Sequence, residues 1–437
     1  MKGLSKIFIL FFAVVLTMAA CSSKEEKVTG DQEVDKTDTK VELTAWAWNV
    51  NVGALNEAAE KFKAEYPNVE LKVEDMGRLD VYDKLSTGLA AGGIGLPDIL
   101  LVEDDRVQGY LQAFPNGFVN LSDKGFDENA NLFPNFKKEM VSKDGDFYGF
   151  PFDAGPGGMF YRTDIFEAAG VSSDDIETWE DFLVAGKQIK EATGAYAMPL
   201  DMYKDDPTYR MMLNQLGVYY FDEEGNIDLT NPKAVQAMQT LKDFADADLI
   251  KDIDGWNGIV SSTIDGSVAA IPFGAWYYGT ITDQAKNSEG NWGVFLLPAF
   301  EKGGNRASNL GGSNWLIPAA SKNIDEAYAF LNFFSTSDEV QLMAMEEFGL
   351  FPSLASVYES ELFIGEVDFF GGQPIWKVFA NQMEDVPTAY YTNDYAIGLD
   401  EAIKAQADVF NGKDVNQALE EAANRLASRT KRELNNY

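Results

Sequence analysis

The sequence predicts an α/β fold built as two lobes, and three observations lead to that prediction. The chain has 437 residues, which is too long for one ordinary hydrophobic core. Strand and helix patterns alternate between Val41 and Val102, as in a parallel sheet covered by helices. The same kind of pattern starts again after residues 148–166, where proline and glycine interrupt the chain.

The first elements follow from the spacing of apolar residues, which has a period of two in strands and of 3.6 in helices. Strands are expected at Val41–Trp48, Val69–Val73 and Ile99–Val102, and helices at Ala54–Tyr66 and Tyr82–Ala91. Ligands of parallel sheets bind beyond the carboxyl ends of the strands. Those ends are Trp48–Asn49 and residues 103–106.

Residues 148–166 are expected to cross from one lobe to the other. Tyr148, Phe150 and Phe152 form one strand face, Gly155–Gly158 is irregular, and Met159–Tyr161 is a second strand. Proline and glycine weaken a strand ladder, so one unbroken central strand is not expected here. An ordinary proline- and glycine-rich loop is the alternative to a hinge.

The second lobe and the return to the first are read from the remaining patterns. Helices are expected at Trp179–Thr193, Arg210–Leu216, Asn231–Leu249, Ile324–Phe334, Ser337–Glu347 and in a set spanning Ile375–Thr430. Strands are expected within Asp265–Trp276, Trp292–Leu297 and Ser308–Ile317. Thr178 with Asp181 resembles a capping box, and Pro232 suits the first position of a helix.

Composition excludes several classes of function. The chain has 35 basic and 70 acidic residues, a net charge of −35, which argues against binding of nucleic acid or of anionic lipid surfaces. It has no histidine and one cysteine, Cys21, so His-based catalytic triads and zinc sites built on His or Cys are excluded. No metal ion or other cofactor is expected, because the Asp- and Gly-rich segments lack the bidentate Glu of a calcium loop.

The N-terminus predicts export and a lipid anchor. Residues 1–20 have a basic start, an apolar core and a small-residue end, which is typical of a signal peptide. The sequence LTMAAC resembles a bacterial lipobox, in which Cys21 would carry the lipid. A plain signal peptide is the alternative. Residues 21–40 are polar and are expected to be a flexible tether that holds a monomer at the extracellular face of the cell membrane, as in Gram-positive lipoproteins.

Seven segments occur in an order that resembles the extracellular solute-binding proteins, family 1, of carbohydrate ABC importers, which include the maltose-binding proteins. They are PDILLVEDDRVQGY, YGFPFDAGPGGMFYRTDIFEAAGV, a helix beginning TWEDF, DGSVAAIPFGAW, WGVFLLP, LGGSNWLIPAASKNIDEAYAFLNFFST and GLFPSL. The resemblance covers the chain from the signal to about Ala427. It implies a type II periplasmic-binding-protein-like fold with discontinuous lobes joined by a three-segment hinge.

The implied lobes are residues 41–150 with 295–347 and residues 151–294 with 348–437. The second crossing is expected near Trp292–Pro298 and the third near Phe348–Ser353. Proteins of this family are not enzymes. The resemblance implies that the chain closes on a carbohydrate, most simply an oligosaccharide, and delivers it to an ABC permease in the membrane.

A sugar site combines carboxylates and amides, which bond to hydroxyl groups, with aromatic rings that cover the ring faces. The resemblance implies ligand contacts at Asn49, Asp104, Asp105, Arg106, Asp153 and Trp276. Further candidates are Trp48 at a strand end, Gly312 with Trp315 beside it, and Asp201 and Tyr391 in the second lobe; an ordinary turn is the alternative for the Gly312 segment. For Trp48 and Trp276 the alternative is a place in the core, and for residues 104–106 it is a solvated loop. Gly312 is expected to let backbone amides approach the ligand.

Two other functions compete with this prediction. Paired carboxylates such as Asp105 and Asp153 would serve a secreted glycoside hydrolase as acid and base. A sugar sensor that signals to a kinase would have the same binding site but no permease. Release of sugar by the purified protein would identify the hydrolase, and a neighbouring importer gene would favour transport over signalling.

Overall fold

A computed structural model describes residues 40–435 and residue 437. The signal peptide, Cys21 and most of the tether lie outside the described residues. Among the helices of the described part, none is long and apolar enough to cross a membrane.

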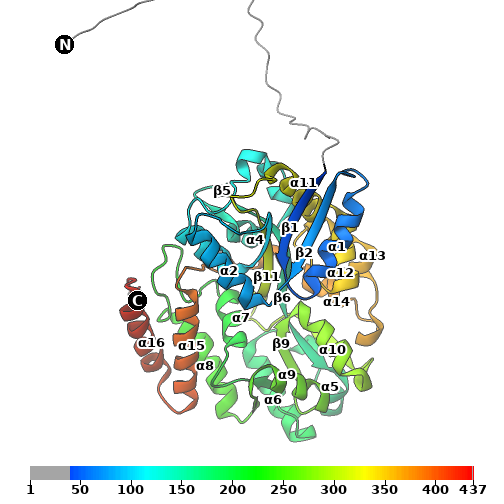
Figure 1. Ribbon diagram of the computed structural model, residues 1–437. Helices are drawn as coiled ribbons and strands as arrows, with labels where there is room; N and C mark the ends of the chain where they lie inside the picture. Colours follow the sequence, from blue (N-terminus) through cyan, green and yellow to red (C-terminus); the bar gives the residue numbers. More distant parts are fainter. Residues whose placement is uncertain (1–39, 436) are drawn as a thin grey trace, which may run out of the picture. The chain divides into compact units, whose positions relative to one another are not determined.

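The described chain alternates strands and helices along most of its length (Figure 1). The strands are β1 (Val41–Ala47), β2 (Val69–Asp75), β3 (Ile99–Glu103), β4 (Ser142–Lys143), β5 (Asp146–Phe147), β6 (Gly149–Arg162), β7 (Met198–Leu200), β8 (Ile250–Asp252), β9 (Ala270–Gly274), β10 (Trp292–Phe295) and β11 (Asn309–Leu316). The helices are α1 (Val50–Phe62), α2 (Arg78–Ala90), α3 (Asp104–Ala113), α4 (Asn135–Met140), α5 (Thr163–Ala169), α6 (Trp179–Thr193), α7 (Pro207–Gln215), α8 (Pro232–Asp246), α9 (Gly255–Asp265), α10 (Tyr278–Gln284), α11 (Ile324–Thr336), α12 (Asp338–Phe348), α13 (Glu361–Ile364), α14 (Ile375–Ala380), α15 (Tyr395–Phe410) and α16 (Val415–Thr430).

Seven of the described strands form one sheet in the order β10-β6-β11-β3-β1-β2, with β9 also paired to β6. The pairs β1–β2 and β1–β3 are parallel, as the alternation of strands and helices predicts. Strand β3 is buried at Ile99–Val102, which suits a strand covered by helices on both faces. Strand β11 returns antiparallel between β3 and β6.

Strand β6 joins two halves of this sheet, and its continuity corrects one prediction. Residues 149–162 form a single strand of 14 residues, not two short strands with a break. The register shifts fall between β6 and β11, next to the pairs of Pro156 with Asn309 and of Pro151 with Asn314. The prolines are tolerated because the pairing is irregular where they lie.

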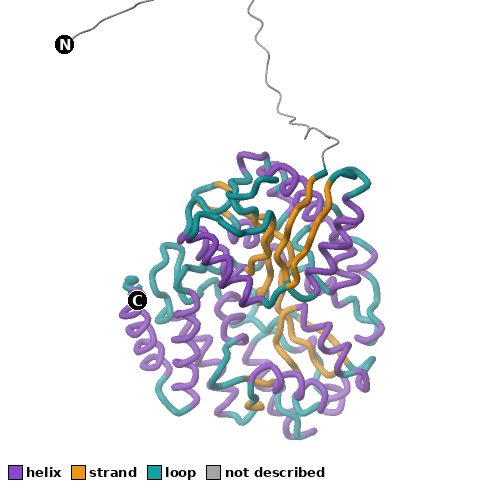
Figure 2. Tube along the Cα trace, in the orientation of Figure 1, coloured by secondary structure: helices purple, strands orange, loops and turns teal. Residues whose placement is uncertain are grey.

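The partners of β6 change along its length. Up to Pro156 it pairs with β11, and from Gly157 onward it pairs with β9, joined from Met159 by β10. We call β2, β1, β3, β11 and the first part of β6 the first half of the sheet, and the second part of β6 with β9 and β10 the second half. Figure 2 shows this strand path passing between two groups of helices.

Local signals fix several helices around the second half. Helix α6 begins with the predicted capping box, since Thr178 Oγ1 accepts from Asp181 N and the Asp181 carboxylate accepts from Thr178 N. Helix α8 has proline at its first position and Asn231 as its cap. Helix α9 was not predicted, although Trp256, Ile259, Val260 and Ile264 have the spacing of one helix face.

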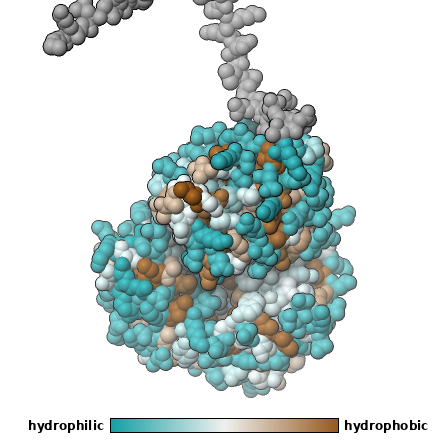
Figure 3. All heavy atoms as spheres, in the orientation of Figure 1, coloured by the Kyte–Doolittle hydropathy of each residue, from teal (hydrophilic) through white to brown (hydrophobic). Residues whose placement is uncertain are grey.

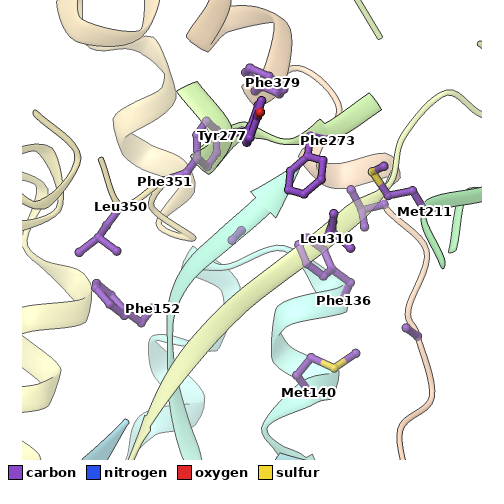
Figure 4. Close-up of a cluster of buried hydrophobic side chains, with 14 of the residues drawn as sticks. Phe136, Met140, Phe152, Met211, Phe273, Tyr277, Leu310, Leu350, Phe351 and Phe379 are labelled. Carbon is purple, nitrogen blue, oxygen red and sulfur yellow. The ribbon is translucent and has the colours of Figure 1, made fainter. Parts of the chain in front are cut away.

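The buried core runs along both halves of the sheet. Phe152 lies between Trp315 and Phe334, with ring centroids 5.2 and 5.0 Å away. Figure 4 shows Phe152, Leu350 and Phe351 near β6 on one side and Met211, Leu310 and Phe136 on the other. Apolar side chains therefore fill the region where β6 changes partners.

Helices α15 and α16 lie beside α8, as in Figure 1. The carboxylate of Glu401 on α15 is buried and paired with Arg425 and Arg429 of α16, each at 2.6 Å.

The face seen in Figure 3 is mainly hydrophilic, with separate hydrophobic patches, in keeping with the net charge of −35.

Candidate functional site

A cluster of polar side chains lies where β3 ends and α3 begins, at one of the predicted strand ends. Asp104 is 3% exposed, and its Oδ1 accepts from Lys137 Nζ at 2.5 Å and from Asn314 Nδ2 at 2.7 Å. Lys137 is fully buried on α4 and also donates to the Ser313 carbonyl at 3.2 Å. Asp153 pairs with Ser313 across the β6–β11 ladder, so strands and helices from distant parts of the sequence meet here.

Three buried acceptor oxygens of this cluster have no hydrogen-bond donor: Asp104 Oδ2, Asp153 Oδ1 and Asn314 Oδ1. Burial raises the pKa of Asp104, and Lys137 opposes that rise. Burial also raises the pKa of Asp153 to about 6, with Lys137 acting against it and Asp104 adding to it. Unpaired buried acceptors are costly, so they indicate a site that is completed by a donor.

Gly312 covers this cluster on β11. Its φ is 109°, a conformation that side chains with a Cβ rarely adopt. A Cβ added there would lie 2.6 Å from Asp104 Oδ2 and 3.1 Å from Lys137 Nζ. Glycine is therefore required for the backbone to lie directly over the carboxylate, which supports the prediction that Gly312 belongs to the site.

Asp105 and Arg106 follow in the first turn of α3 and face the second group of helices. Burial and the neighbouring Glu103 raise the pKa of Asp105 to about 6, whereas Arg106 and Arg210 lower it. The Asp105 Oδ1 atom is buried without a donor, and Arg106 Nε lies 3.6 Å away. The Arg106 guanidinium also lies over the Tyr82 ring, 5.3 Å from its centroid. Asp105 therefore interacts electrostatically with Glu103 and Arg106 beside it and with Arg210 of α7 in the second helix group.

Trp276 presents an aromatic ring at the end of β9. It is 41% exposed, and its Nε1 donates to the Leu310 carbonyl at 2.8 Å. Glycines from three strands adjoin this edge of the indole: a Cβ on Gly155, Gly274 or Gly311 would come within 3.3 Å of it. The ring is thus fixed by its pyrrole edge while nearly half of its surface stays open, which argues against a core position.

Trp48 and Asn49 lie at the end of β1. Trp48 is 6% exposed and packs edge-on against Tyr82, with 5.8 Å between ring centroids. Trp46 is 7% exposed, so both indoles contribute to the core. Asn49 is exposed, has a φ of 53° and makes no side-chain cap to α1, which leaves its amide available.

Two predicted contacts, Trp315 and Asp201, have other surroundings than expected. Trp315 is fully buried between Phe152 and Phe334, so the prediction that it flanks a ligand is corrected to a core role. Successive residues of a strand point to opposite faces, so its side chain points away from that of Asn314, which bonds to Asp104. Asp201 is 4% exposed and accepts hydrogen bonds from the backbone of Tyr203, Lys204 and Gly255.

Tyr391 lies in a cluster of tyrosine rings, 5.2 Å from Tyr219 and 5.0 Å from Tyr395. Burial raises its pKa well above the ordinary value, and the charges of Asp105 and Asp104 contribute. It therefore lies on the side of the second helix group that faces α3.

Sequence reasoning missed three polar or aromatic residues at this site: Lys137, Arg210 and Trp256. Lys137 lies on a short helix with no periodic signal, and Arg210 was read only as a helix start. Arg210 bonds to Asp206 at 2.8 Å and to the Tyr395 hydroxyl at 3.4 Å. A tryptophan directly after Asp254–Gly255, a helix-start pattern, was the signal that could have revealed Trp256.

Among the described residues, no group of three or more Asp, Glu, His or Cys side chains is placed to hold a metal ion. The arrangement suits a polyhydroxylated ligand instead. Unpaired carboxylate and amide oxygens would accept from hydroxyl groups, and the exposed indole would cover an apolar ring face.

Known proteins are similar to this chain in sequence and in fold. The bacterial extracellular solute-binding protein family matches residues 57–370. A lactose-binding protein of Rhizobium radiobacter is 36% identical over 83% of this chain and 87% of its own length. An arabinooligosaccharide-binding protein of Bacillus subtilis is 28% identical over 98% of this chain and 99% of its own length.

A crystal structure of an extracellular solute-binding protein of family 1 superposes with a TM-score of 0.78 at 24% identity, over 89% of this chain and 99% of that one. This agreement confirms the predicted α/β periplasmic-binding-protein fold. The family consists of binding proteins that are not enzymes, so the hydrolase alternative is set aside. The chain belongs to the bacterial extracellular solute-binding protein family.

Proposed function

We propose that this protein is the carbohydrate-binding component of an ABC importer, with an oligosaccharide as its ligand. The observation that carries this proposal is that the site combines two features: three buried acceptors without donors, and the exposed indole of Trp276, held in place by its bond to Leu310. Hydroxyl groups at the edge of a sugar ring and C–H groups on its face need this combination. The names of the lactose- and arabinooligosaccharide-binding relatives support the same class of ligand.

Capture by hinge closure is the second part of the proposal. Three segments run side by side where the sheet halves join: Ala154–Gly157, Asn309–Gly312 and Leu350–Ser353. Ala154 N donates to the Phe351 carbonyl and Gly157 N to the Ser308 carbonyl, both at 2.8 Å. Gln382 donates to Gly157 O in the first segment and accepts from Ser308 N, the residue directly before the second segment. We take these segments as the three crossings.

This assignment moves the second crossing from the expected Trp292–Pro298. The Pro298 and Asn305 carbonyls both accept from Gln215 Nε2 of α7 at 2.9 Å. Ser308 Oγ donates to the Met211 carbonyl of α7 at 2.9 Å. Residues 298–308 therefore remain with the second helix group, and the chain crosses only at β11.

Export and anchoring complete the proposal. The signal-like N-terminus and the lipobox-like LTMAAC indicate that Cys21 carries lipid and holds a monomer at the outer face of the membrane, where it would deliver sugar to a permease. We expect Cys21→Ser to move the protein from the membrane fraction to the culture medium. Retention of this variant at the membrane would contradict a lipid anchor at this residue.

A thermal-shift panel tests the binding function. Lactose and arabinooligosaccharides are the first ligands to include. At a concentration one hundred times its Kd, a ligand stabilises the folded state by about 2.7 kcal/mol. Trp276→Ala should abolish the shift, whereas Val184→Ala, an exposed position on α6, should leave it unchanged. No shift with any sugar of a broad glycan panel would overturn the proposal.

A further inference from the structure

Two of the eight tryptophans are exposed, and they contact each other. Trp256 is 47% exposed and Trp276 is 41% exposed, whereas each of the other six is at most 8% exposed. We propose that Trp256 extends the platform of Trp276 and binds a second sugar ring, so that it sets the preferred length of the ligand. This inference rests on the proposed carbohydrate-binding function.

The two indoles lie against each other with nearly parallel planes. Their ring centroids are 6.0 Å apart and their planes differ by 21°. Phe273 lies edge-on to both, with centroids 6.2 Å from Trp256 and 4.9 Å from Trp276. Large exposed aromatic surfaces that continue from a binding site are typical of interaction sites.

Trp276 is bonded to β11, the strand that covers the polar cluster, whereas Trp256 packs around the end of β9. Trp276 bonds to the Leu310 carbonyl, two residues before Gly312, which covers Asp104. The ring contacts of Trp256 are all with residues that end or follow β9: Phe273, Trp276 and Tyr277. A first ring held at the carboxylates and Trp276 would therefore place the next ring toward Trp256.

The position of Trp256 is fixed before any ligand binds. Asp201 Oδ2 accepts from Gly255 N at 2.8 Å, which holds the first turn of α9. Tyr277, fully buried and bonded through its hydroxyl to Thr263 Oγ1 at 2.6 Å, supports Trp256 edge-on at 5.7 Å. A preformed platform loses little conformational freedom on binding, so its contacts add fully to affinity. Asp201 is thus a positioning residue for the platform.

A sugar fits this surface better than a protein segment does. Trp276 is bonded to the strand that covers three unsatisfied acceptors, two of them carboxylate oxygens, and these acceptors require hydroxyl or other polar donors. A protein partner docking on the indoles alone would leave those acceptors buried and unpaired.

The test compares sugars of different length by isothermal titration calorimetry. Wild type, Trp256→Ala and Trp256→Phe are titrated with galactose and lactose, and with arabinose, arabinobiose and arabinotriose. We expect Trp256→Ala to raise the Kd of a bound di- or trisaccharide by about tenfold. The Kd of the matching monosaccharide should change by less than about twofold, because the first ring does not reach Trp256.

Controls separate this result from misfolding and from failure of the proposed function. Trp256→Phe should recover most of the affinity, and Ile94→Ala, 78% exposed in the loop before β3, should behave as wild type. Equal effects of Trp256→Ala on short and long sugars, or no effect, would overturn the inference while leaving carbohydrate binding intact. Binding of monosaccharides alone by wild type would do the same. If wild type binds no sugar at all, both proposals fail.

Discussion

Lys137 is the residue on which the charge balance of the site depends. It is a fully buried cation between two buried carboxyl groups, with Asp104 in direct contact at 2.5 Å and Asp153 within electrostatic reach. Removing one member of a buried ion pair leaves the other charge uncompensated, which costs about 3–5 kcal/mol. Lys137→Met should therefore lower the free energy of unfolding by about that amount.

The free energy of unfolding that Lys137→Met loses should be greater at pH 8 than at pH 5.5, because the carboxyl groups of Asp104 and Asp153 can take up protons at the lower pH. Urea denaturation of the variant and of wild type at both pH values measures this loss. Lys138→Met changes the neighbouring, partly exposed lysine and should cost far less. Adding Asp104→Asn to Lys137→Met should restore part of the stability, and a double variant no more stable than Lys137→Met would contradict the ion-pair account.

At the scale of elements, the strands and helix starts that depend on short local sequence patterns could be predicted from the sequence. The three parallel strands β1, β2 and β3, the capping box of α6 and the proline start of α8 all agree with the structure. Strand β6 was wrongly divided because its two prolines and four glycines disfavour a continuous strand when the partner strand is not known. Irregular pairing with β11 accommodates those residues, and no property of residues 149–162 alone shows that.

The residue types of the site could be predicted from the sequence, but their surroundings could not, because those depend on distant parts of the chain. Strand ends and family resemblance named Asp104, Asp153 and Gly312 as candidates, but whether a side chain points into the site depends on packing. Trp315 and Trp276 are both tryptophans near glycine at strand ends, yet one is fully buried and the other 41% exposed. Lys137 comes from a separate short helix, so only the folded chain brings it to the carboxylates.

At the scale of the whole molecule, ligand binding should be linked to a proton at the junction of the two sheet halves. The pKa of Asp153 is raised to about 6, chiefly by burial, above its ordinary value of 3.8. A carboxyl group with a raised folded pKa destabilises the folded state as it ionises, so stability falls as pH rises from about 4 through 6. A difference of about 2 pKa units corresponds to roughly 3 kcal/mol at most.

A sugar that donates a hydroxyl hydrogen bond to the ionised Asp153 would offset that cost, since charged acceptors form the stronger bonds. We therefore expect sugar affinity to rise between pH 5 and pH 7, with release of about half a proton per sugar bound near pH 6, where about half of the Asp153 carboxyl groups are protonated before binding. Calorimetry in buffers of different ionisation enthalpy measures both. Asp153→Asn should flatten the pH profile of sugar affinity more than Asp105→Asn does. Asp105 is the matched control, because its carboxyl group also has a pKa of about 6 but faces Arg210. Affinity that is independent of pH in wild type, or that rises on acidification, would show that no ionised carboxylate at this junction accepts from the ligand.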